Sequence, residues 1–315
     1  MGPLKILIWG IHGSYLNTLV HIPHQWYLPV KPDRPEGYGG MGRGLLKTDH
    51  VCDVPAEEVS DLDLDLVIFQ TPKNYFQDQF EILSPEQQQK LPKIYLQHNV
   101  PKPHATDTRH PVDDPSTLLV HVTHYNRLMW DNNRTPTVVI EHSVAIDPRV
   151  RYQGHLERGI TVINSMPERG RALGHDLFIE ARKQIPLDIA GFGNEGLNPI
   201  GDFAYQELHF RVAEYRFLYS PIRYTSLPLS VIEALHIGMP VVALATTELP
   251  TVIENGVHGY ISCEPDELIE RMRHLLAHPA EARRLGENAR TLARDRFNLE
   301  RFTADWNRAF ERVLS

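Results

Sequence analysis

The stretch that decides the fold is YSPIRYTSLPLSVIEALHIGMPVV, at residues 219–242. An apolar run over residues 217–222 is typical of a buried strand, and residues 229–237 repeat apolar side chains at helical spacing. Gly238 ends this helix, because glycine tolerates the backbone conformation of a helix end, and Pro240 prevents its continuation. A second buried strand follows at once, which predicts a strand–turn–helix–strand unit of a parallel α/β sheet.

The turn before this helix is a candidate ligand site. Thr225 or Ser226 can cap the helix, and Pro228 suits its first turn, where a missing N–H costs little. The turn follows the carboxyl end of a parallel strand, where open α/β sheets bind their ligands. A helix N-terminus offers free N–H groups and a partial positive charge, so we expect the amides of Leu229 and Ser230 to bind a phosphate.

Glu233 lies one turn further into the predicted helix. From there its carboxylate can accept the hydroxyl protons of a bound ribose. The simpler alternative is an exposed helix residue, but the surrounding sequence EALHIGMPVV is largely apolar. A carboxylate among buried residues requires a partner, so we expect Glu233 to be bonded to a neighbour or to a ligand.

The rest of the chain repeats this alternation of apolar runs and helix-like segments. The runs predict ten buried strands, at residues 5–10, 66–70, 93–98, 118–124, 137–144, 160–165, 187–192, 217–222, 241–245 and 259–263. Right-handed crossovers arrange these strands into two doubly wound parallel sheets, five strands in each. The polar stretch 145–159 holds Pro148 and Gly154, which is typical of an interdomain linker. The predicted division is an N-terminal domain, a linker, a C-terminal domain and a last helix, at residues 1–147, 148–159, 160–298 and 299–315.

The composition excludes several classes of protein. The 315 residues suffice for two α/β domains, and 42% hydrophobic and 23% charged residues are ordinary for a globular chain. A net charge of -8 argues against nucleic acid as a partner. No apolar run is long enough to span a bilayer, and MGPLKILIWG does not resemble a signal peptide. Cys52 and Cys263 have no metal or redox spacing, so we expect a cytoplasmic protein.

The stretch 219–242 resembles the C-terminal signature of the retaining family-4 glycosyltransferases of the GT-B fold. That signature runs Pro-Ser-x-x-Glu-Gly-Phe-Gly-Leu-x-x-x-Glu-Ala-x-x-x-Gly-x-Pro-Val, and its second half matches Glu233, Ala234, Gly238, Pro240 and Val241. The sequence VIENGVHGYIS at residues 252–262 resembles the motif that follows. The resemblance covers the C-terminal half well and the N-terminal half loosely. It implies two Rossmann-like domains facing each other across a cleft, with the C-terminal helix returning to the N-terminal domain.

The resemblance also implies roles for single residues. In the family the second glutamate of the signature binds the ribose, a role that falls to Glu233, and the amides after the turn bind the diphosphate, a role for Leu229 and Ser230. Thr225 stands where the family has the glutamate that contacts the transferred sugar, and Pro228 replaces a glycine. The nucleotide half of the implied site is therefore intact, and the identity of the sugar stays open.

Basic residues should meet the diphosphate as well. The family has an Arg and a Lys in Gly-Arg-x-x-x-x-Lys-Gly, and the corresponding stretch here is INSMPERGRALGHDLFIEA at residues 163–181. Leu173 occupies the lysine position, as Thr251 occupies that of a further glutamate. We infer that Arg169 and Arg171 bind the diphosphate instead, because guanidinium groups bind phosphate through two parallel bonds. Two solvated surface arginines are the alternative.

The N-terminal half offers weaker candidates. GIHGSY at residues 10–15 follows the first strand, and the family has a glycine-rich loop here. Gly13 permits close approach of a ligand, so Gly13 and Ser14 are candidates for contacts with the acceptor or the phosphates. His98 ends a predicted strand where the family has a histidine that contacts the donor sugar, which makes it our candidate catalytic residue, with a structural histidine as the alternative. Other histidines near predicted strand ends are His12, His121, His124 and His142.

Two further patterns are less specific. Residues 22–44 are rich in Pro and Gly, which predicts a long loop whose Trp26, Tyr27 and Tyr38 stack on an acceptor or anchor the loop itself. The run DLDLD at residues 61–65 has the Asp-x-Asp spacing of metal-dependent glycosyltransferases. Because it leads directly into a strand, we expect a solvated approach to that strand rather than a metal site.

Together these patterns predict a metal-independent, retaining glycosyltransferase. It would move a hexose-type sugar from a nucleotide-diphosphate sugar of UDP or GDP type, without a further cofactor, to a glycan, a lipid-linked molecule or a small molecule. A peripheral contact with the inner face of a membrane stays open. The alternatives are a sugar-nucleotide-binding protein without transferase activity and an enzyme of the same fold with other chemistry, such as an epimerase or a phosphorylase.

Overall fold

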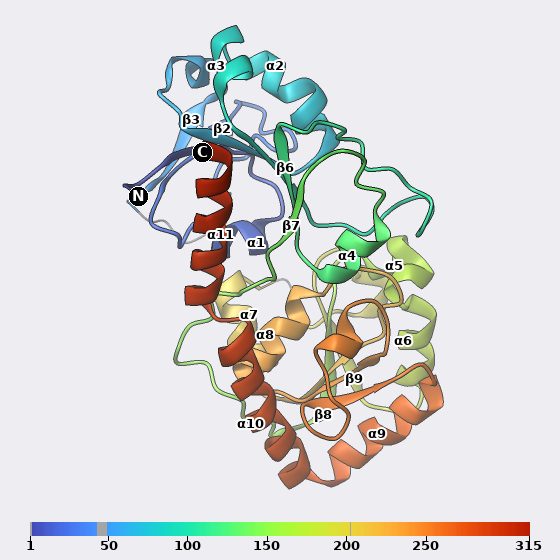
Figure 1. Cartoon of the computed structure of the whole chain (residues 1–315). Coiled ribbons are helices and arrows are strands. Elements are labelled where there is room, and N and C mark those ends of the chain that lie inside the picture. The colour runs from blue at the N-terminus through green and yellow to red at the C-terminus, as the bar shows by residue number, and fades with distance from the viewer. Residues whose placement is uncertain (1, 43–48, 202) are drawn as a thin grey trace. The chain divides into compact units, whose positions relative to one another are not determined.

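The chain divides into two compact units in the computed structural model, which describes residues 2–42, 49–201 and 203–315. Unit 1 comprises Met1–Ser143 and Leu299–Ser315, and unit 2 comprises Val144–Asn298. Figure 1 labels the helices and strands by the names used below. None of the helices within the described residues is both long and apolar enough to cross a membrane.

Unit 1 is built on a sheet of seven parallel strands in the order β3-β2-β1-β4-β5-β6-β7. They are β1 (Lys5–Ile8), β2 (Gln25–Val30), β3 (Val51–Pro55), β4 (Leu66–Phe69), β5 (Lys93–Gln97), β6 (Thr117–His121) and β7 (Thr137–Val139). The connections hold α1 (Gly13–Leu19), the 3-10 helix η1 (Ala56–Asp61), the π-helix η2 (Asn74–Asp78), α2 (Gln79–Ile82), α3 (Pro85–Lys90) and α4 (His124–Met129). The central strands are buried along their length, as expected where both faces of a parallel sheet are covered.

The last helix, α11 (Leu299–Leu314), belongs to unit 1. It lies beside the N-terminal strands in Figure 1, and Trp306 Nε1 donates a hydrogen bond to the Tyr15 hydroxyl at 3.2 Å. The rings of Phe302 and Phe310 pack edge to face on Tyr15 and His24, with centroids 5.7 and 5.3 Å apart. The predicted return of the C-terminal helix to the N-terminal domain is confirmed.

The prediction of one long loop at residues 22–44 was wrong, because β2 lies within it; residues 43 and 44 lie outside the described part. Pro29 conceals the strand in the sequence. It is tolerated because β1 pairs with β2 only as far as Tyr27, so Pro29 has a neighbouring strand on one side only. Trp26 and Tyr38 are completely buried, so they anchor this segment and do not offer a stacking surface.

Unit 2 is built on five parallel strands in the order β12-β11-β10-β8-β9. They are β8 (Leu156–Val162), β9 (Leu187–Ala190), β10 (Tyr215–Ser220), β11 (Val241–Leu244) and β12 (Gly259–Ser262). The helices are α5 (Met166–Arg169), α6 (His175–Arg182), α7 (Tyr205–Val212), α8 (Leu229–Ile237), α9 (Pro265–Ala277) and α10 (Pro279–Arg296), with 3-10 turns η3 (Gly170–Leu173), η4 (Glu195–Leu197) and η5 (Leu249–Thr251). All ten predicted strands are therefore present, and the sequence reading missed only β2 and β3 among the described strands.

Helix α8 ends where the sequence predicts. Gly238 closes it in the left-handed conformation, with φ 88°, and β11 begins three residues later. Helix α10 packs closely against the same glycine. A Cβ added to Gly286 in α10 would lie only 2.0 Å from the Gly238 carbonyl oxygen, so this close approach requires glycine at position 286. Two glycines thus let α10 touch the backbone at the end of α8, and α8 is held firmly against its own sheet.

Candidate functional site

The N-terminus of α8 has open backbone amides at the carboxyl end of β10. Pro228 occupies the N-cap position with extended backbone and forms no side-chain hydrogen bond to the helix, so α8 starts uncapped and the predicted caps Thr225 and Ser226 were wrong. The first amide bonded within the helix belongs to Val231, which donates to the Pro228 carbonyl at 3.1 Å. The amides of Leu229 and Ser230 precede that bond and carry the positive end of the helix dipole, as a phosphate site requires.

Two arginines share one carboxylate at this edge of the sheet: Arg171 lies in η3, Asp176 in the first turn of α6, and Arg223 in the loop after β10. Arg223, just after β10, donates to both oxygens of Asp176 at 2.6 and 2.9 Å and to the Arg171 carbonyl at 2.9 Å. Arg171 donates to the same carboxylate at 2.7 Å. The bond from Arg223 holds the pKa of Asp176 below its ordinary value, so the carboxylate stays ionised. The cluster of two arginines and one aspartate then carries one net positive charge.

Arg169, the other predicted arginine, lies outside this cluster. It ends α5 with its side chain exposed to solvent. Arg223 is the second arginine of the cluster, and the sequence analysis did not name it even though it lies only two residues before Thr225. The signal was a basic residue directly after a buried strand, in the loop already chosen as the ligand site. Leu173, at the family's lysine position, is buried in the core.

Glu233 is buried, with 7% of its surface exposed, and it has a partner. The Tyr205 hydroxyl donates to Glu233 Oε1 at 2.9 Å. Burial, followed by the charge of Glu233, raises the pKa of Tyr205 well above its ordinary value, so the phenol keeps the proton of this bond. The alternative of an exposed helix residue is thereby excluded.

His209 completes the surroundings of Glu233. Its Nε2 atom lies 3.6 Å from Glu233 Oε1, and its ring packs edge to face on Tyr205 with centroids 4.6 Å apart. Tyr205 and His209 are four residues apart on α7, so both face α8. Nothing in the local sequence of α7 points to Glu233, and the sequence reading missed both residues.

An exposed aromatic ring stands at the same edge of the sheet. Phe192, with 59% of its surface exposed, follows β9 between Gly191 and Gly193, which have φ of 120° and 71°. Its carbonyl accepts from the Ser165 amide at 2.8 Å, and its amide donates to Asn164 Oδ1 at 3.2 Å. The backbone that carries this exposed ring is therefore held in place on both sides of Phe192.

In unit 1 the structure gathers three of the named histidines around one tyrosine. The ring of His98 lies 4.1 Å from that of His12 and 4.7 Å from that of Tyr15, and His142 lies 5.4 Å from Tyr15. Burial, and then the nearby His12 and His142, lower the pKa of His98 well below its ordinary value. Its Nε2 atom is bonded to Gln70 Oε1 at 2.9 Å. His98 is thus a neutral imidazole near neutral pH.

Gly13 and Ser14 start α1 beside this cluster, and both are exposed. The residue before them, His12, has a left-handed backbone with φ 53°. A Cβ added to Gly13 would meet nothing within 4 Å. The protein itself therefore does not require glycine at this position, and a ligand that approaches the backbone remains a reason for it.

The other candidates have structural surroundings. His121 is bonded to Asn132 at 2.7 Å, and His124 is an exposed first residue of α4, which Thr123 caps. In the run at residues 61–65, Asp63 and Asp65 both bind Lys5. Across residues 2–42, 49–201 and 203–315 there is no group of three His, Cys, Asp or Glu that could hold a metal ion.

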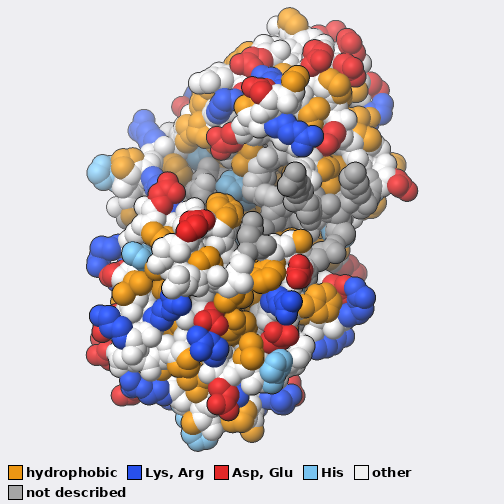
Figure 2. Space-filling model, turned by 180° about the vertical axis from the view of Figure 1, so that it is seen from behind, with side chains coloured by type: hydrophobic (Ala, Val, Ile, Leu, Met, Phe, Trp, Pro, Cys, Tyr) orange, Lys and Arg blue, Asp and Glu red, His pale blue; other side chains and the backbone are white. Residues whose placement is uncertain are grey.

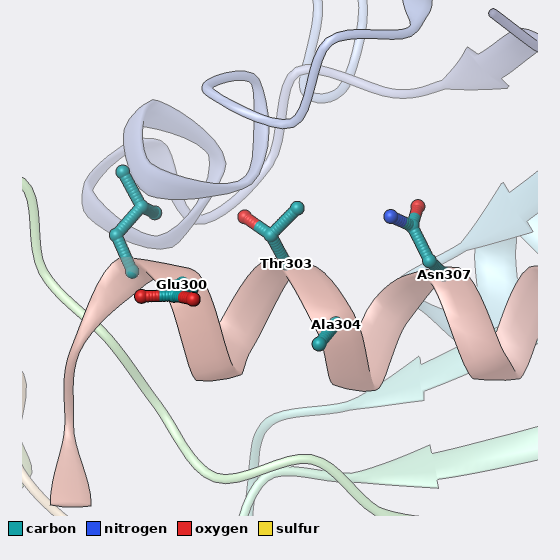
Figure 3. Close-up of a pocket in the computed structure, with 5 residues that line it drawn as sticks. Glu300, Thr303, Ala304 and Asn307 are labelled. Carbon is teal, nitrogen blue, oxygen red and sulfur yellow. The ribbon is translucent and has the colours of Figure 1, made fainter.

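The surface gives two further observations. On the face drawn in Figure 2, acidic and basic side chains are interspersed and form no field of one sign. A shallow hollow runs along α11 and is lined by Leu299, Glu300, Thr303, Ala304 and Asn307. Figure 3 shows Thr303 and Asn307 on the same side of the helix. One carboxylate and two neutral polar groups on a single helix provide no catalytic arrangement, so this hollow is not a candidate active site.

Part of unit 2 matches a family model, and the whole chain is similar in fold to several solved structures. Residues 204–292, which include α7, α8 and β10, match the family model of glycosyl transferases group 1. Sucrose-phosphate synthase of Thermosynechococcus elongatus is 14% identical over 98% of this chain and 99% of that one, with a TM-score of 0.72. HepE of Anabaena in complex with UDP-glucose is 14% identical over 98% and 100%, with a TM-score of 0.72. A glycosyltransferase of Rickettsia africae is 13% identical over the full length of both chains, with a TM-score of 0.68.

None of the curated proteins compared with the chain matches it. The structural likeness shows the fold: the chain has the GT-B fold, with two Rossmann-like domains on parallel sheets. The fold predicted from the sequence is confirmed.

Proposed function

We propose that the chain is a glycosyltransferase that moves a hexose-type sugar from a nucleotide-diphosphate sugar to an acceptor, with retention of configuration and without a metal ion. One observation carries the proposal. The uncapped start of α8 and the buried Glu233 lie one helical turn apart at the carboxyl edge of the unit 2 sheet, within the residues that match glycosyl transferases group 1. Open amides suit a diphosphate, and a carboxylate suits the hydroxyl groups of a ribose.

The diphosphate is assigned to the amides of Leu229 and Ser230 and to the guanidinium groups of Arg171 and Arg223. A departing nucleoside diphosphate gains negative charge as the glycosidic bond breaks, and fixed positive groups stabilise that charge in the transition state. The Asp176 carboxylate now occupies both arginines. We infer that the diphosphate competes with it for one of the two, so that Asp176 orients the pair in the empty site. Arg169, which is exposed, keeps its predicted role only as a second contact.

The nucleoside is assigned to Glu233 and Phe192. A ribose has two neighbouring hydroxyl groups, and a carboxylate has two oxygens that can accept from both. Tyr205 occupies Oε1 in the empty site, so a ribose bound through both oxygens must displace the tyrosine hydroxyl. The exposed ring of Phe192 suits stacking on a flat base. Because HepE is described in complex with UDP-glucose, UDP is the first nucleotide to test, and GDP is the second.

The reacting sugar is assigned to His98, and contacts of the acceptor or phosphates to Gly13 and Ser14, as the resemblance implies. Retention through a protein nucleophile would require a carboxylate beside the anomeric carbon. The carboxylates in the proposed site already have other roles: Glu233 binds ribose and Asp176 binds arginine. We therefore favour departure of the leaving group and attack of the acceptor on the same face, with the protein contributing position and charge.

The test is a thermal-shift screen of the whole chain against UDP, GDP, ADP, CMP and TDP and their common sugar conjugates. A ligand that binds only the folded state raises its melting temperature, so we expect a selective shift with one nucleotide. Glu233→Gln should reduce that shift strongly. No shift with any nucleotide at millimolar concentration would contradict the proposal.

A second candidate, a binding protein without transferase activity, is favoured by one observation. At two positions where the resemblance expects charged residues, Leu173 is buried and Thr251 donates to Glu248 at 2.9 and 3.0 Å, so both have structural roles. Incubation of the shifted donor with candidate glycans, lipid-linked sugars and small alcohols separates the two. Release of nucleoside diphosphate supports the transferase, and binding without any release supports the alternative.

A further inference from the structure

A chain of two hydrogen bonds connects the backbone to His98. Gln70 Nε2 donates to the Trp9 carbonyl at 2.8 Å, and Gln70 Oε1 is bonded to His98 Nε2 at 2.9 Å. Trp9, Gln70 and His98 directly follow the neighbouring strands β1, β4 and β5, so the topology places them side by side at the carboxyl edge of the sheet. Gln70 and His98 are both buried, and no competing solvent reaches the bonds between them.

The first bond determines the orientation of the amide. A carbonyl oxygen only accepts hydrogen bonds, so the group that faces the Trp9 carbonyl must be the NH₂ of Gln70. The flipped amide would place two oxygens 2.8 Å apart without a proton between them, which costs the energy of an unsatisfied buried pair. The carbonyl oxygen of Gln70 therefore faces His98.

The second bond determines the tautomer of the histidine. An amide oxygen accepts and never donates, so the proton of the bond belongs to His98 Nε2. A neutral imidazole carries one N–H, which leaves Nδ1 as an acceptor. The ring cannot turn freely, because the rings of His12 and Tyr15 pack on it. The backbone that carries it is fixed as well, since Asn126 Nδ2 donates to the His98 carbonyl at 3.1 Å.

A second pair in the same unit shows what a purely structural version looks like. Gln97 Oε1 is bonded to His110 Nε2 at 3.0 Å, and Gln97 Nε2 donates to the Asn99 carbonyl at 2.8 Å, so this tautomer is fixed in the same way. There, however, the Val112 amide donates to His110 Nδ1 at 3.1 Å, and both ring nitrogens are used by the protein. For His98 Nδ1, the described part of the chain supplies no hydrogen bond.

We propose that Gln70 is a positioning residue that holds His98 in the Nε2–H tautomer, so that Nδ1 is an acceptor reserved for a hydroxyl group of the ligand. The inference rests on the proposed role of His98 at the reacting sugar. It adds a rule of specificity: the sugar must present a hydroxyl group to this atom. A deoxy or fluoro sugar offers no proton there and leaves the nitrogen unpaired in a buried site.

The first test reads the tautomer without any ligand. Nitrogen-15 NMR of the histidine side chains distinguishes protonated from unprotonated ring nitrogens in the whole chain. We expect a single Nε2–H form for His98 in the unaltered protein and a loss of that single form in Gln70→Leu, which has no acceptor. The matched control is Gln97→Leu, which removes a similarly buried glutamine. Because Gln97 directly precedes His98 at the end of β5, its side chain points to the face of the sheet opposite that of His98, and the variant should leave the His98 tautomer unchanged. An Nδ1–H form in the unaltered protein, or an unchanged His98 in Gln70→Leu, overturns the inference.

The second test reads specificity, with UDP-glucose and its singly deoxygenated analogues as probes. We expect the unaltered protein and Gln97→Leu to discriminate against one analogue by roughly tenfold in kcat/KM, and Gln70→Leu to lose that discrimination. Equal discrimination in all three proteins overturns the rule of specificity. If UDP-glucose is not the donor, the same comparison is made with the donor that the thermal-shift screen identifies. If no nucleotide sugar is bound or turned over, the proposed function has failed, and the tautomer measurement decides the role of Gln70 independently.

Discussion

The two candidate regions lie at the carboxyl edges of two parallel sheets, yet they differ in charge. In unit 2 the groups are ions and open amides, namely Arg171, Arg223, Glu233 and the start of α8. In unit 1 they are neutral imidazoles, because burial lowers the pKa of His98 and His142. The difference is consistent with the division of roles proposed above. Ions gain binding energy from a charged group such as a diphosphate, whereas neutral donors and acceptors distinguish hydroxyl groups by their position.

Acid should damage unit 1 before unit 2, and this is the largest effect we predict. Burial lowers the pKa of His110 and His121 to about 4 and that of His142 to about 3. In the unfolded chain these residues take up protons near pH 6.5, so below that pH the unfolded state binds more protons and the free energy of unfolding falls. Linkage gives a loss of about 2 kcal/mol per histidine at pH 5.

Tryptophan fluorescence reports on unit 1 alone. All four tryptophans, Trp9, Trp26, Trp130 and Trp306, belong to that unit. Denaturant titrations followed by tryptophan fluorescence at pH 7 and pH 5 should therefore show a loss of several kcal/mol. Unit 2, followed by hydrogen exchange of its own backbone amides, should lose less. In that unit burial lowers the pKa of His236 and His258, two histidines against the three named above, and the bond from Arg223 holds the pKa of Asp176 below its ordinary value, which preserves its ion pair in acid. A larger loss in unit 2 would reverse the comparison.

Glu233→Gln most directly tests the ionic region of unit 2, which consists of Arg171, Arg223, Glu233 and the start of α8. The variant keeps the shape of the side chain and an acceptor for Tyr205, but it loses the charge and one of two acceptor oxygens. We expect the Kd of the nucleotide identified by thermal shift to rise about 30-fold in calorimetry, since hydrogen bonds to charged groups are strong. Glu207→Gln, an exposed glutamate on α7, is the control and should bind normally. Unchanged affinity in Glu233→Gln would remove the ribose from this place.

Arg223→Gln and Arg169→Gln together test which arginine binds the diphosphate: Arg223, as proposed from the structure, or Arg169, as predicted from the sequence. We expect kcat/KM for the donor to fall about tenfold or more, because a fixed cation is lost where the leaving group gains charge. Arg169→Gln, at the arginine predicted from sequence and found exposed, should change kcat/KM less than about twofold.

The control for stability is Arg158→Gln, which breaks a similar two-bond pair with Asp188 near the amino end of the same sheet. It should lower the melting temperature as Arg223→Gln does and leave kcat/KM unchanged. The reverse ranking of Arg169 and Arg223 would restore the assignment made from the sequence.

The fold was predictable because its signals are local. Buried parallel strands are apolar along their length, and Gly238 and Pro240 mark the end of α8 and the start of β11 in the sequence itself. The missed strand β2 contains Pro29, whose cost depends on how far the neighbouring strand extends, and no local pattern contains that information.

The surroundings of the candidate site could be predicted only in part, because many of its contacts are not local. Glu233 and the amides of α8 follow from spacing along one helix. Tyr205 reaches Glu233 across 28 residues, and Gln70 reaches His98 across 28, so these contacts exist only after the sheets have formed. Arg223 and Arg171 meet because β8 and β10 are neighbours in the sheet, which the order of the strands along the chain does not reveal.

Tyr205→Phe should have the smallest effect. It tests whether Glu233 in unit 2 exchanges its hydrogen-bond partner on binding, whereas His98 in unit 1 keeps its partner. If the ionic region is built for exchange, Glu233 must give up the tyrosine hydroxyl when a ribose arrives. Removing that hydroxyl leaves a buried carboxylate without its donor in the empty protein and removes the competitor from the bound one. We therefore expect a lower melting temperature and a nucleotide Kd about threefold tighter.

Tyr215→Phe is the matched control, because its hydroxyl donates to Asp188 at 2.9 Å in the same unit and away from α8. It should lower the melting temperature without any change in affinity. Weaker binding in Tyr205→Phe alone would mean that the tyrosine holds Glu233 in place for the ribose. The ionic region would then be locked in the way that Gln70 locks His98, and the two units would differ in charge but not in rigidity.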